Sequence, residues 1–204
     1  MNFVEAAKEV LKMDVDLVVS VVKWASDRNL ILGSDMKCQF LKLVSEFAEL
    51  AESVNSVQLE DGEFSSHDIV DAIGDCLVVT IIMKEQLFAS IDGDFNLNRS
   101  ELDPLKYFNP YEESLGADEA LIVLGYLGDH IAKYQPREIL EDIQCIQLLL
   151  ATSAESLVEL NLDKCLLSAY NEIKDRKGVM YDGVFVKESD ERYDGIMKEL
   201  SLLA

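Results

Sequence analysis

Two pairs of carboxylates stand at helical spacing in this sequence. Glu46 and Glu49 are three residues apart in "LVSEFAELAESV", and Asp71 and Asp75 are four residues apart in "DIVDAIGD". Residues three or four apart lie on the same face of a helix, so each pair is expected to project together. Both pairs fall in phase with apolar neighbours, which places them toward the buried side of their helices.

A buried carboxylate must share a proton or meet a cation, because an unpaired buried charge costs several kcal/mol. If the two helices are antiparallel neighbours, all four carboxylates converge on one place. Oxygen ligands on facing helices suit Mg²⁺ or Mn²⁺. We therefore expect a metal site made by Glu46, Glu49, Asp71 and Asp75, with Mg²⁺ as the cofactor and Mn²⁺ as a substitute. The plain alternative is that each pair lies at a partly exposed helix edge.

The elements that would carry these residues are helices. Apolar residues recur at three-to-four spacing in six segments, which are 3–28, 36–55, 66–90, 118–134, 136–158 and 161–177. Ser34 or Asp35 is expected to cap the second helix, and Asp182–Gly183 indicates a small hairpin. The predicted fold class is all-α, an antiparallel helical bundle.

A weak internal repeat adds a question about architecture. A shift of 70 residues lays "DIVDAIGDCLVVT" over "EILEDIQCIQLLLA", with Asp71 over Glu141 and Asp75 over Cys145. One interpretation is a degenerate second helical repeat that has lost its acidic set. The other is a chance similarity between two amphipathic helices of similar length.

We expect one compact domain with four parts. Residues 1–91 form the helical core with the acidic metal site, and residues 92–117 form a connector. Residues 118–187 form a second helical segment that ends in the basic stretch "YNEIKDRKG" and the hairpin, and residues 188–204 form an acidic C-terminal tail.

The composition restricts the function classes. The 204 residues carry a formal net charge of −21, which repels phosphate backbones and makes a general nucleic-acid binder unfavourable. The longest apolar run, around "CLVVTIIM", is too short for a membrane span, and the N-terminus lacks the pattern of a signal peptide. The four cysteines show no CxxC spacing and are typical of a reducing compartment, so we expect a cytoplasmic protein.

Five motifs in order carry a family resemblance: "KWASDRNL", "KLVSEFAELAE", "DIVDAIGDCLVV", "AYNEIKDRKG" and "GVFVK". In this order they resemble the MazG-like all-α nucleoside triphosphate pyrophosphohydrolases, especially the phage and bacterial branch. The resemblance covers about residues 20–90 and 161–187. It implies the helical-bundle fold of that superfamily.

The resemblance also implies an enzyme. Members of the family use Mg²⁺ to hydrolyse an NTP or dNTP to the monophosphate and pyrophosphate, as nucleotide-pool housekeeping. Glu46 and Glu49 match the glutamates of the family's ExxE motif, so the resemblance gives them catalytic and metal-binding roles. Asp75 matches the terminal aspartate of the second motif.

The sequence departs from the family pattern at two places. Ser45 stands where the family usually has a further glutamate, and Ala72 stands where the second motif usually begins with one. Asp71, one residue earlier, would take the place of the latter on the same helix face. These departures motivate an alternative, a catalytically weakened module that binds or senses nucleotides.

By the same resemblance, "YNEIKDRKG" closes over the phosphates and an aromatic residue of the first helix stacks on the base. The candidate substrate-binding residues are Trp24, Asn29, Lys42, Asn171, Lys174 and Arg176. The ordinary alternatives are cations facing a helix C-terminus and a tryptophan in the core. The expected partners are a nucleoside triphosphate and, because MazG-like domains commonly pair, a second copy or an intrachain pseudo-dimer. A third hypothesis is a non-enzymatic helical interaction protein with a solvated acidic face.

Overall fold

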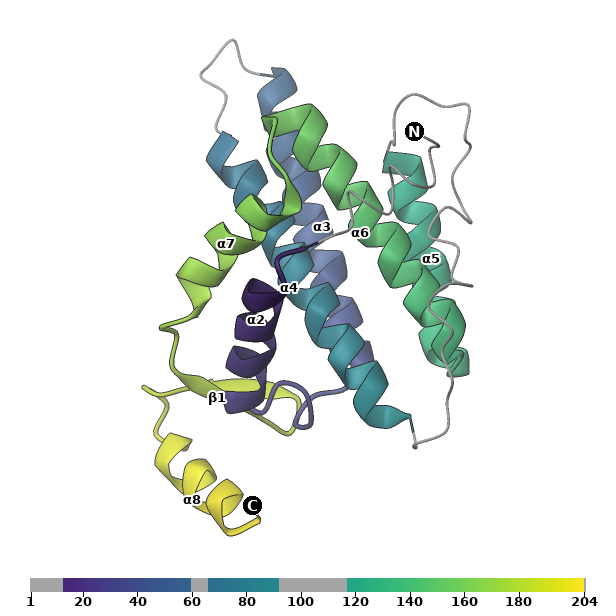
Figure 1. Ribbon diagram of the computed structural model, residues 1–204. Helices are drawn as coiled ribbons and strands as arrows, with labels where there is room; N and C mark the ends of the chain where they lie inside the picture. Colours follow the sequence, from purple (N-terminus) through teal and green to yellow (C-terminus); the bar gives the residue numbers. More distant parts are fainter. Residues whose placement is uncertain (1–12, 60–65, 92–116, 204) are drawn as a thin grey trace.

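The computed structural model describes residues 13–59, 66–91 and 117–203. Over these residues it is mostly helical, with seven helices packed together and one two-stranded hairpin (Figure 1). The elements are α2 (Val15–Asp27), α3 (Met36–Leu59), α4 (Ser66–Ser90), α5 (Ala117–Lys133), α6 (Pro136–Val158), α7 (Leu162–Ile173), β1 (Gly178–Tyr181), β2 (Val184–Lys187) and α8 (Tyr193–Leu203).

The helix α4 is the centre of the fold. Its buried residues run almost without interruption from Ala72 to Met83, so apolar side chains cover its whole circumference rather than one stripe. A helix that is apolar all round must be enclosed by neighbours. The helices α2, α3, α6 and α7 all pack against α4, and together they bury one continuous hydrophobic core (Figure 1).

Two antiparallel helix pairs make up most of this core. The helices α3 and α4 lie side by side and run in opposite directions, as do α5 and α6 (Figure 1). Tyr134, in the left-handed region with a φ of 51°, allows the tight reversal between α5 and α6. The two pairs meet where α4 packs against α6 and α3 packs against α5.

The helix α7 approaches α4 very closely at Gly74. A Cβ atom at this position would lie 2.3 Å from the backbone oxygen of Cys165, so only glycine fits between the two helices. Asn161 caps the start of α7 by accepting a 3.2 Å hydrogen bond from the backbone N–H of Lys164. The close approach brings the end of α7 over the face of α4 that carries Asp75.

The hairpin closes one end of the molecule. Asp182 and Gly183 have φ values of 48° and 74°, as a type I′ turn requires, and the strands pair with Val179 opposite Val186. The N–H of Met180 donates a 2.7 Å hydrogen bond to the carbonyl of Arg28, which joins β1 to the end of α2. A small second apolar cluster packs α8 against the hairpin.

The predicted helices are confirmed, with one correction at the start of α2. Five of the six begin and end within a few residues of the prediction, and Asp35 caps α3 by accepting a 2.8 Å hydrogen bond from the N–H of Cys38. The first predicted helix is wrong at residues 13 and 14, because the Asp14 side chain accepts from the N–H groups of Asp16 and Leu17 and so starts α2 at Val15. Residues 3–12 of that prediction lie outside the described residues.

Most of the predicted acidic C-terminal segment is helical. Residues 193–203 form the helix α8, whose Ile196 is buried against the hairpin. Apolar residues at three-to-four spacing supply this contact despite the acidic composition of the segment. The predicted connector, except for Ala117 at the start of α5, lies outside the described residues.

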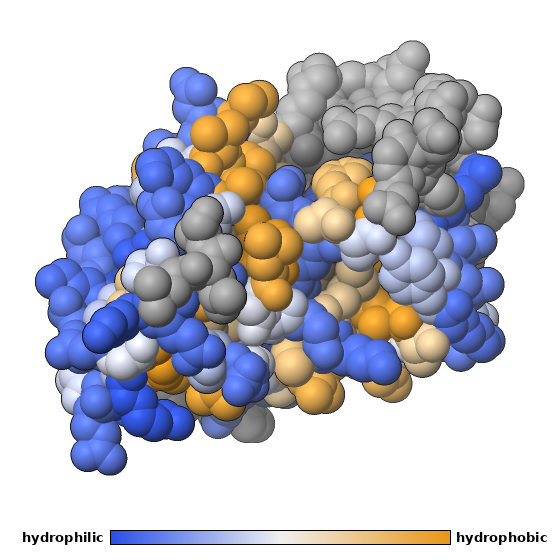
Figure 2. Space-filling model, turned by 90° about the horizontal axis from the view of Figure 1, so that it is seen from below, coloured by the Kyte–Doolittle hydropathy of each residue, from blue (hydrophilic) through white to orange (hydrophobic). Residues whose placement is uncertain are grey.

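Apolar groups on the surface lie among charged ones. The face seen from below is largely hydrophilic, with apolar patches between the polar side chains (Figure 2). Among the described residues, no single helix is long and apolar enough to cross a membrane, and only α6 and α7 taken together, across a 95° bend, reach that length and composition.

Candidate functional site

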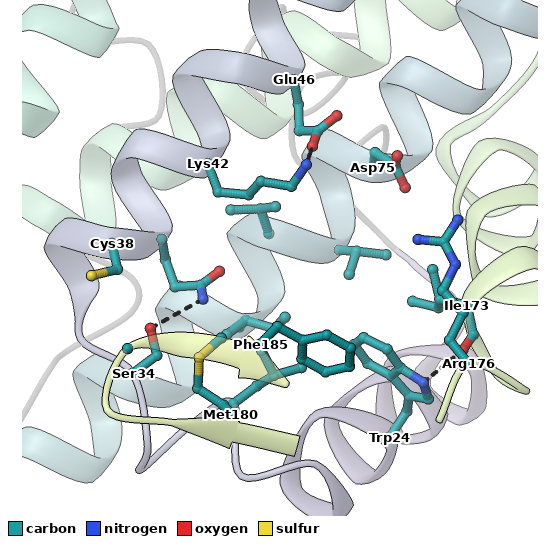
Figure 3. Close-up of a pocket in the computed structure, with 16 residues that line it drawn as sticks. Trp24, Ser34, Cys38, Lys42, Glu46, Asp75, Ile173, Arg176, Met180 and Phe185 are labelled. Carbon is teal, nitrogen blue, oxygen red and sulfur yellow. Dashed lines mark hydrogen bonds and ion pairs between the residues drawn. The ribbon is translucent and has the colours of Figure 1, made fainter. Parts of the chain in front are cut away.

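A cavity of about 390 Å³ opens between α2, α3, α4, the end of α7 and the hairpin (Figure 3). This volume lies within the range of small-molecule sites in proteins. Its walls are mostly apolar and aromatic, with a few polar groups. The lining residues are Trp24, Leu30, Ser34, Cys38, Gln39, Lys42, Glu46, Asp75, Val78, Val79, Ile82, Ile173, Arg176, Met180, Gly183 and Phe185.

Glu46 is the buried acid of this cavity. Its side chain is 1% exposed, and the ammonium group of Lys42, one helical turn earlier, forms an ion pair with Oε1. Neither carboxylate oxygen has a well-oriented hydrogen-bond donor among the described residues. Although burial lowers the pKa of Lys42, the Glu46 carboxylate raises it overall, so the lysine is held as a cation. A buried carboxylate with so little hydrogen bonding can accept a further cation.

Asp75 faces the same cavity from α4 (Figure 3). Burial is the main cause that raises its pKa to about 6, and the negative charges of Glu46 and Asp71 add to the effect. Lys42 and Arg176 oppose the shift without cancelling it. Asp75 therefore lies where burial and neighbouring negative charge disfavour its ionised form.

The other two predicted carboxylates lie outside the cavity lining. Glu49 is exposed, so the expectation that it faces the buried side is wrong. On α3, Glu46 and Leu50 are four residues apart and both are buried. Glu49 directly precedes Leu50, and its side chain projects toward solvent. Asp71 is half-buried, and its Oδ1 is enclosed without a hydrogen-bond partner among the described residues. Burial and the neighbouring Glu172 raise the pKa of Asp71.

Arg176 brings a positive charge to the cavity from the segment after α7 (Figure 3). Arg28 holds this segment in place: its Nε donates to the carbonyl of Arg176 at 2.7 Å, and its Nη2 donates to the carbonyl of Lys174 at 3.2 Å. The Arg28 guanidinium also lies 4.9 Å from the centre of the Trp24 ring. Arg28 thus positions the basic segment rather than contacting the cavity.

Three predicted substrate-binding residues do not line the cavity. Asn29 donates a 3.0 Å hydrogen bond to the carbonyl of Met180, so it fastens the loop after α2 to β1. Lys174 and Asn171 are exposed and bind each other at 2.8 Å. The basic stretch therefore reaches the cavity through Arg176.

Trp24 anchors the end of α7 and also lines the cavity. Its Nε1 donates a 2.8 Å hydrogen bond to the carbonyl of Ile173, which anchors the end of α7. Its ring also lines the cavity, where it lies beside Phe185 along one wall (Figure 3). An aromatic wall of this kind can pack against a flat ligand.

Sequence reasoning missed part of this wall. Met180 and Phe185 come from the hairpin, and Gln39 and Ser34 come from α3 and the loop before it. The motif "GVFVK" contains Phe185, but nothing in its pattern shows that the hairpin folds back onto the cavity. Gln39 precedes Glu46 by seven residues, two helical turns, and this spacing is the signal that could have found it.

The two carboxylates that line the cavity, Glu46 and Asp75, are the candidates for holding a metal ion. Among the described residues, no three His, Cys, Asp or Glu side chains are close enough to hold an ion together. Mg²⁺ in phosphate-binding sites commonly uses one or two carboxylates and completes its shell with water and substrate phosphates. Glu46, whose oxygens meet the Lys42 ammonium but no well-oriented hydrogen-bond donor, and Asp75 would supply such a pair.

Comparison with known proteins gives one limited relation. No protein-family model matches the chain, and no solved structure matches it significantly. A stretch of 71 residues is 38% identical to "Uncharacterized 18.2 kDa protein in rep-hol intergenic region" of Haemophilus phage HP1 (strain HP1c1). The match covers 34% of this chain and 39% of the length of that relative. The chain is therefore similar in part to a phage protein whose printed name states no activity.

Proposed function

We propose that this protein is a Mg²⁺-dependent nucleoside triphosphate pyrophosphohydrolase of the MazG-like all-α type. The observation that carries the proposal is the buried Glu46 carboxylate, paired with Lys42 but without a well-oriented hydrogen-bond donor, at one end of a ligand-sized cavity. Asp75 and Arg176 lie at the same end, and Trp24 and Phe185 form a wall at the other (Figure 3). This polarity suits a nucleotide, with phosphates at the acidic and basic end and the base against the aromatic wall.

The cations explain how so acidic a protein would hold a polyphosphate. A chain with a net charge of −21 repels a nucleoside triphosphate at long range. Lys42 and Arg176 line the cavity and supply positive charge locally. When bound, Mg²⁺ held by Glu46 and Asp75 would neutralise the phosphates and favour attack at phosphorus.

The reaction proposed is hydrolysis of the α–β phosphoanhydride bond. The oxygen of a water molecule forms a new bond to phosphorus, the bridging bond breaks, and pyrophosphate leaves from the nucleoside monophosphate. Glu49 is the candidate for accepting the proton of this water. It is exposed, it follows Glu46 by three residues, which is less than one turn of α3, and its charge is felt at Lys42.

The packing of α5–α6 on α3–α4 is relevant to the expected pairing of two MazG-like units. The pair α5–α6 packs on α3–α4 through α4 and α6, and we propose that it takes the place of a second copy in an intrachain pseudo-dimer. The two carboxylates of α6 nearest the shifted position of Asp71 have protein partners: Glu141 pairs with Arg137, and Oδ2 of Asp142 lies 2.6 Å from Nδ1 of His130. We propose that this half is structural and that each chain has one site.

A second candidate function is nucleotide binding without turnover. It is favoured by the absence, among the described residues, of a group of three metal ligands, together with Ser45 and Ala72 at positions where the family carries glutamate. Such a module would bind a nucleotide with Mg²⁺ in the same cavity and release it unchanged.

The two candidates are separated by one experiment. Purified protein is incubated with Mg²⁺ and a panel of NTPs and dNTPs, while nucleotide consumption and nucleotide-dependent melting temperature are both recorded. Turnover of at least one nucleotide supports the enzyme. A shift in melting temperature without turnover supports the binding module, and neither change would refute both.

A further inference from the structure

Gln39 is a buried amide in the cavity wall with most of its hydrogen-bonding capacity unused. Its side chain is 6% exposed. Its Nε2 donates one long hydrogen bond, 3.4 Å, to Oγ of Ser34, and the side chain has no other hydrogen bond among the described residues (Figure 3). A primary amide offers two donors and an acceptor with two lone pairs. The unused groups open onto the cavity, where a bound ligand can meet them.

The position of Gln39 relative to Glu46 sets what that ligand would be. Gln39, Lys42 and Glu46 lie on one face of α3, and all three line the cavity. Seven residues of α-helix separate the amide from the carboxylate, an axial distance of about 10 Å. The amide therefore lies at the end of the cavity away from the acidic group, where the walls are formed by side chains such as Met180 and Phe185 (Figure 3).

We propose that Gln39 is a specificity-determining residue that binds the hydrogen-bonding edge of the nucleobase. The inference rests on the proposed function, because it takes the acidic end as the phosphate site. An amide presents a donor and an acceptor side by side, which matches the neighbouring donor and acceptor on the edge of a base. The flat face of the same base packs against the aromatic wall, and Ser34 fixes the orientation of the amide.

The test compares Gln39→Met with the wild-type chain. Methionine keeps the length and unbranched shape of the side chain and removes its donor and acceptor. Isothermal calorimetry with Mg²⁺ measures the binding of dAMP, dCMP, dGMP and dTMP, and of inorganic tripolyphosphate, which has no base. Gln147→Met is the matched control, because Gln147 is also buried, at 2% exposure, but belongs to α6 and lies outside the cavity lining.

The expected result is a loss of discrimination. The wild-type protein should prefer one base, and Gln39→Met should weaken the binding of that nucleotide by about 10- to 100-fold. The four affinities should then fall close together while tripolyphosphate binding is unchanged. Gln147→Met should keep the wild-type order of affinities. Gln39→Glu, which retains acceptors and loses the donor, should change the order of preference, an effect that a merely structural role would not produce.

The outcomes distinguish a failure of the inference about Gln39 from a failure of the proposed function. Unchanged base preference in both Gln39 variants would overturn the role of Gln39 and leave the proposed function standing. Base-selective binding that depends on Gln39 without hydrolysis of any triphosphate would overturn the enzyme and support this inference. A wild-type protein that binds none of the four monophosphates would overturn the role of Gln39, whereas the proposed enzyme is tested separately by triphosphate turnover. Circular dichroism of each variant establishes that the fold is retained.

Discussion

Glu46 on α3 and Asp75 on α4 face the same cavity, and the charge of Glu46 helps to raise the pKa of Asp75 to about 6. Two carboxylates placed together in this way oppose each other's ionisation. A fold that keeps both must compensate for the repulsion, either with a proton at low pH or with a cation at neutral pH. Changes to Glu46 or Asp75 should therefore affect the stability of the fold, the binding of a metal ion and the proposed reaction.

The first prediction concerns pH. A carboxyl group whose folded pKa is raised stabilises the fold fully below its unfolded pKa, here 3.8, and that contribution is lost as the pH rises through about 6. Without metal, the melting temperature should therefore fall between about pH 4 and pH 7, and Asp75→Asn should reduce this fall. Thermal unfolding followed by circular dichroism over a pH series measures it. An equal pH dependence in Asp75→Asn would show that Asp75 is not the group responsible.

Glu46→Gln should separate stability from metal binding. The substitution removes a buried charge whose oxygens have no well-oriented donor, so the melting temperature without metal should be unchanged or higher. Stabilisation by Mg²⁺ with nucleotide should disappear, and turnover should fall at least about 100-fold, the upper end of the loss typical for an outer-shell partner of a metal site. Scanning calorimetry with and without Mg²⁺ provides the measurement. Retained metal-dependent stabilisation would place the metal elsewhere.

Glu49→Gln should behave differently, because Glu49 is exposed and does not line the cavity. Mg²⁺ and nucleotide should still stabilise the protein, since Glu46 and Asp75 remain. If Glu49 accepts the proton from water, turnover should fall by about 100-fold or more, as for the loss of a general base. Glu52→Gln, a change of another exposed glutamate one turn further along α3, is the control and should leave turnover unchanged. Equal turnover in both variants would remove Glu49 from the mechanism.

Gly74→Ala tests the helix contact that positions α7. The new Cβ would lie 2.3 Å from the carbonyl oxygen of Cys165, so the helices must separate, at a cost of about 1–3 kcal/mol or more. Gly125→Ala is a matched control on α5, because nothing lies within 4 Å of its Cβ position, and it should stabilise the fold by up to about 1 kcal/mol. Urea unfolding of both variants gives the two free energies of unfolding. Similar values for both would contradict the close packing of α4 and α7.

The sequence predicted the helices well because their signals are local. Apolar periodicity, Pro136 at the start of α6 and the Asp182–Gly183 turn each act within a few residues of themselves, and the structure places the corresponding elements as expected. The error at the start of α2 has the same origin. Asp14 fits a helical pattern by spacing, but its side chain satisfies the first free N–H groups and so begins the helix there.

The candidate site was predicted in part, because it depends on contacts between distant segments. Spacing indicates Glu46 and Asp75, the family resemblance adds Arg176, and all three line the cavity. The sequence could not show that the Asn29 side chain is hydrogen-bonded to a carbonyl of β1, 151 residues away. Nor could it show that Phe185 reaches the cavity from the hairpin. Glu49 was misplaced because a three-residue step around a helix can cross from the buried face to the solvent.

The most direct test of the central proposal is the identity of the products. Phosphorus NMR of the wild-type protein with Mg²⁺ and each common ribonucleoside and deoxyribonucleoside triphosphate should show a nucleoside monophosphate and pyrophosphate in equal amounts for at least one substrate. Neither product should form with Glu46→Gln. Release of orthophosphate from the triphosphate, or no change in any nucleotide, would contradict the proposed pyrophosphohydrolase.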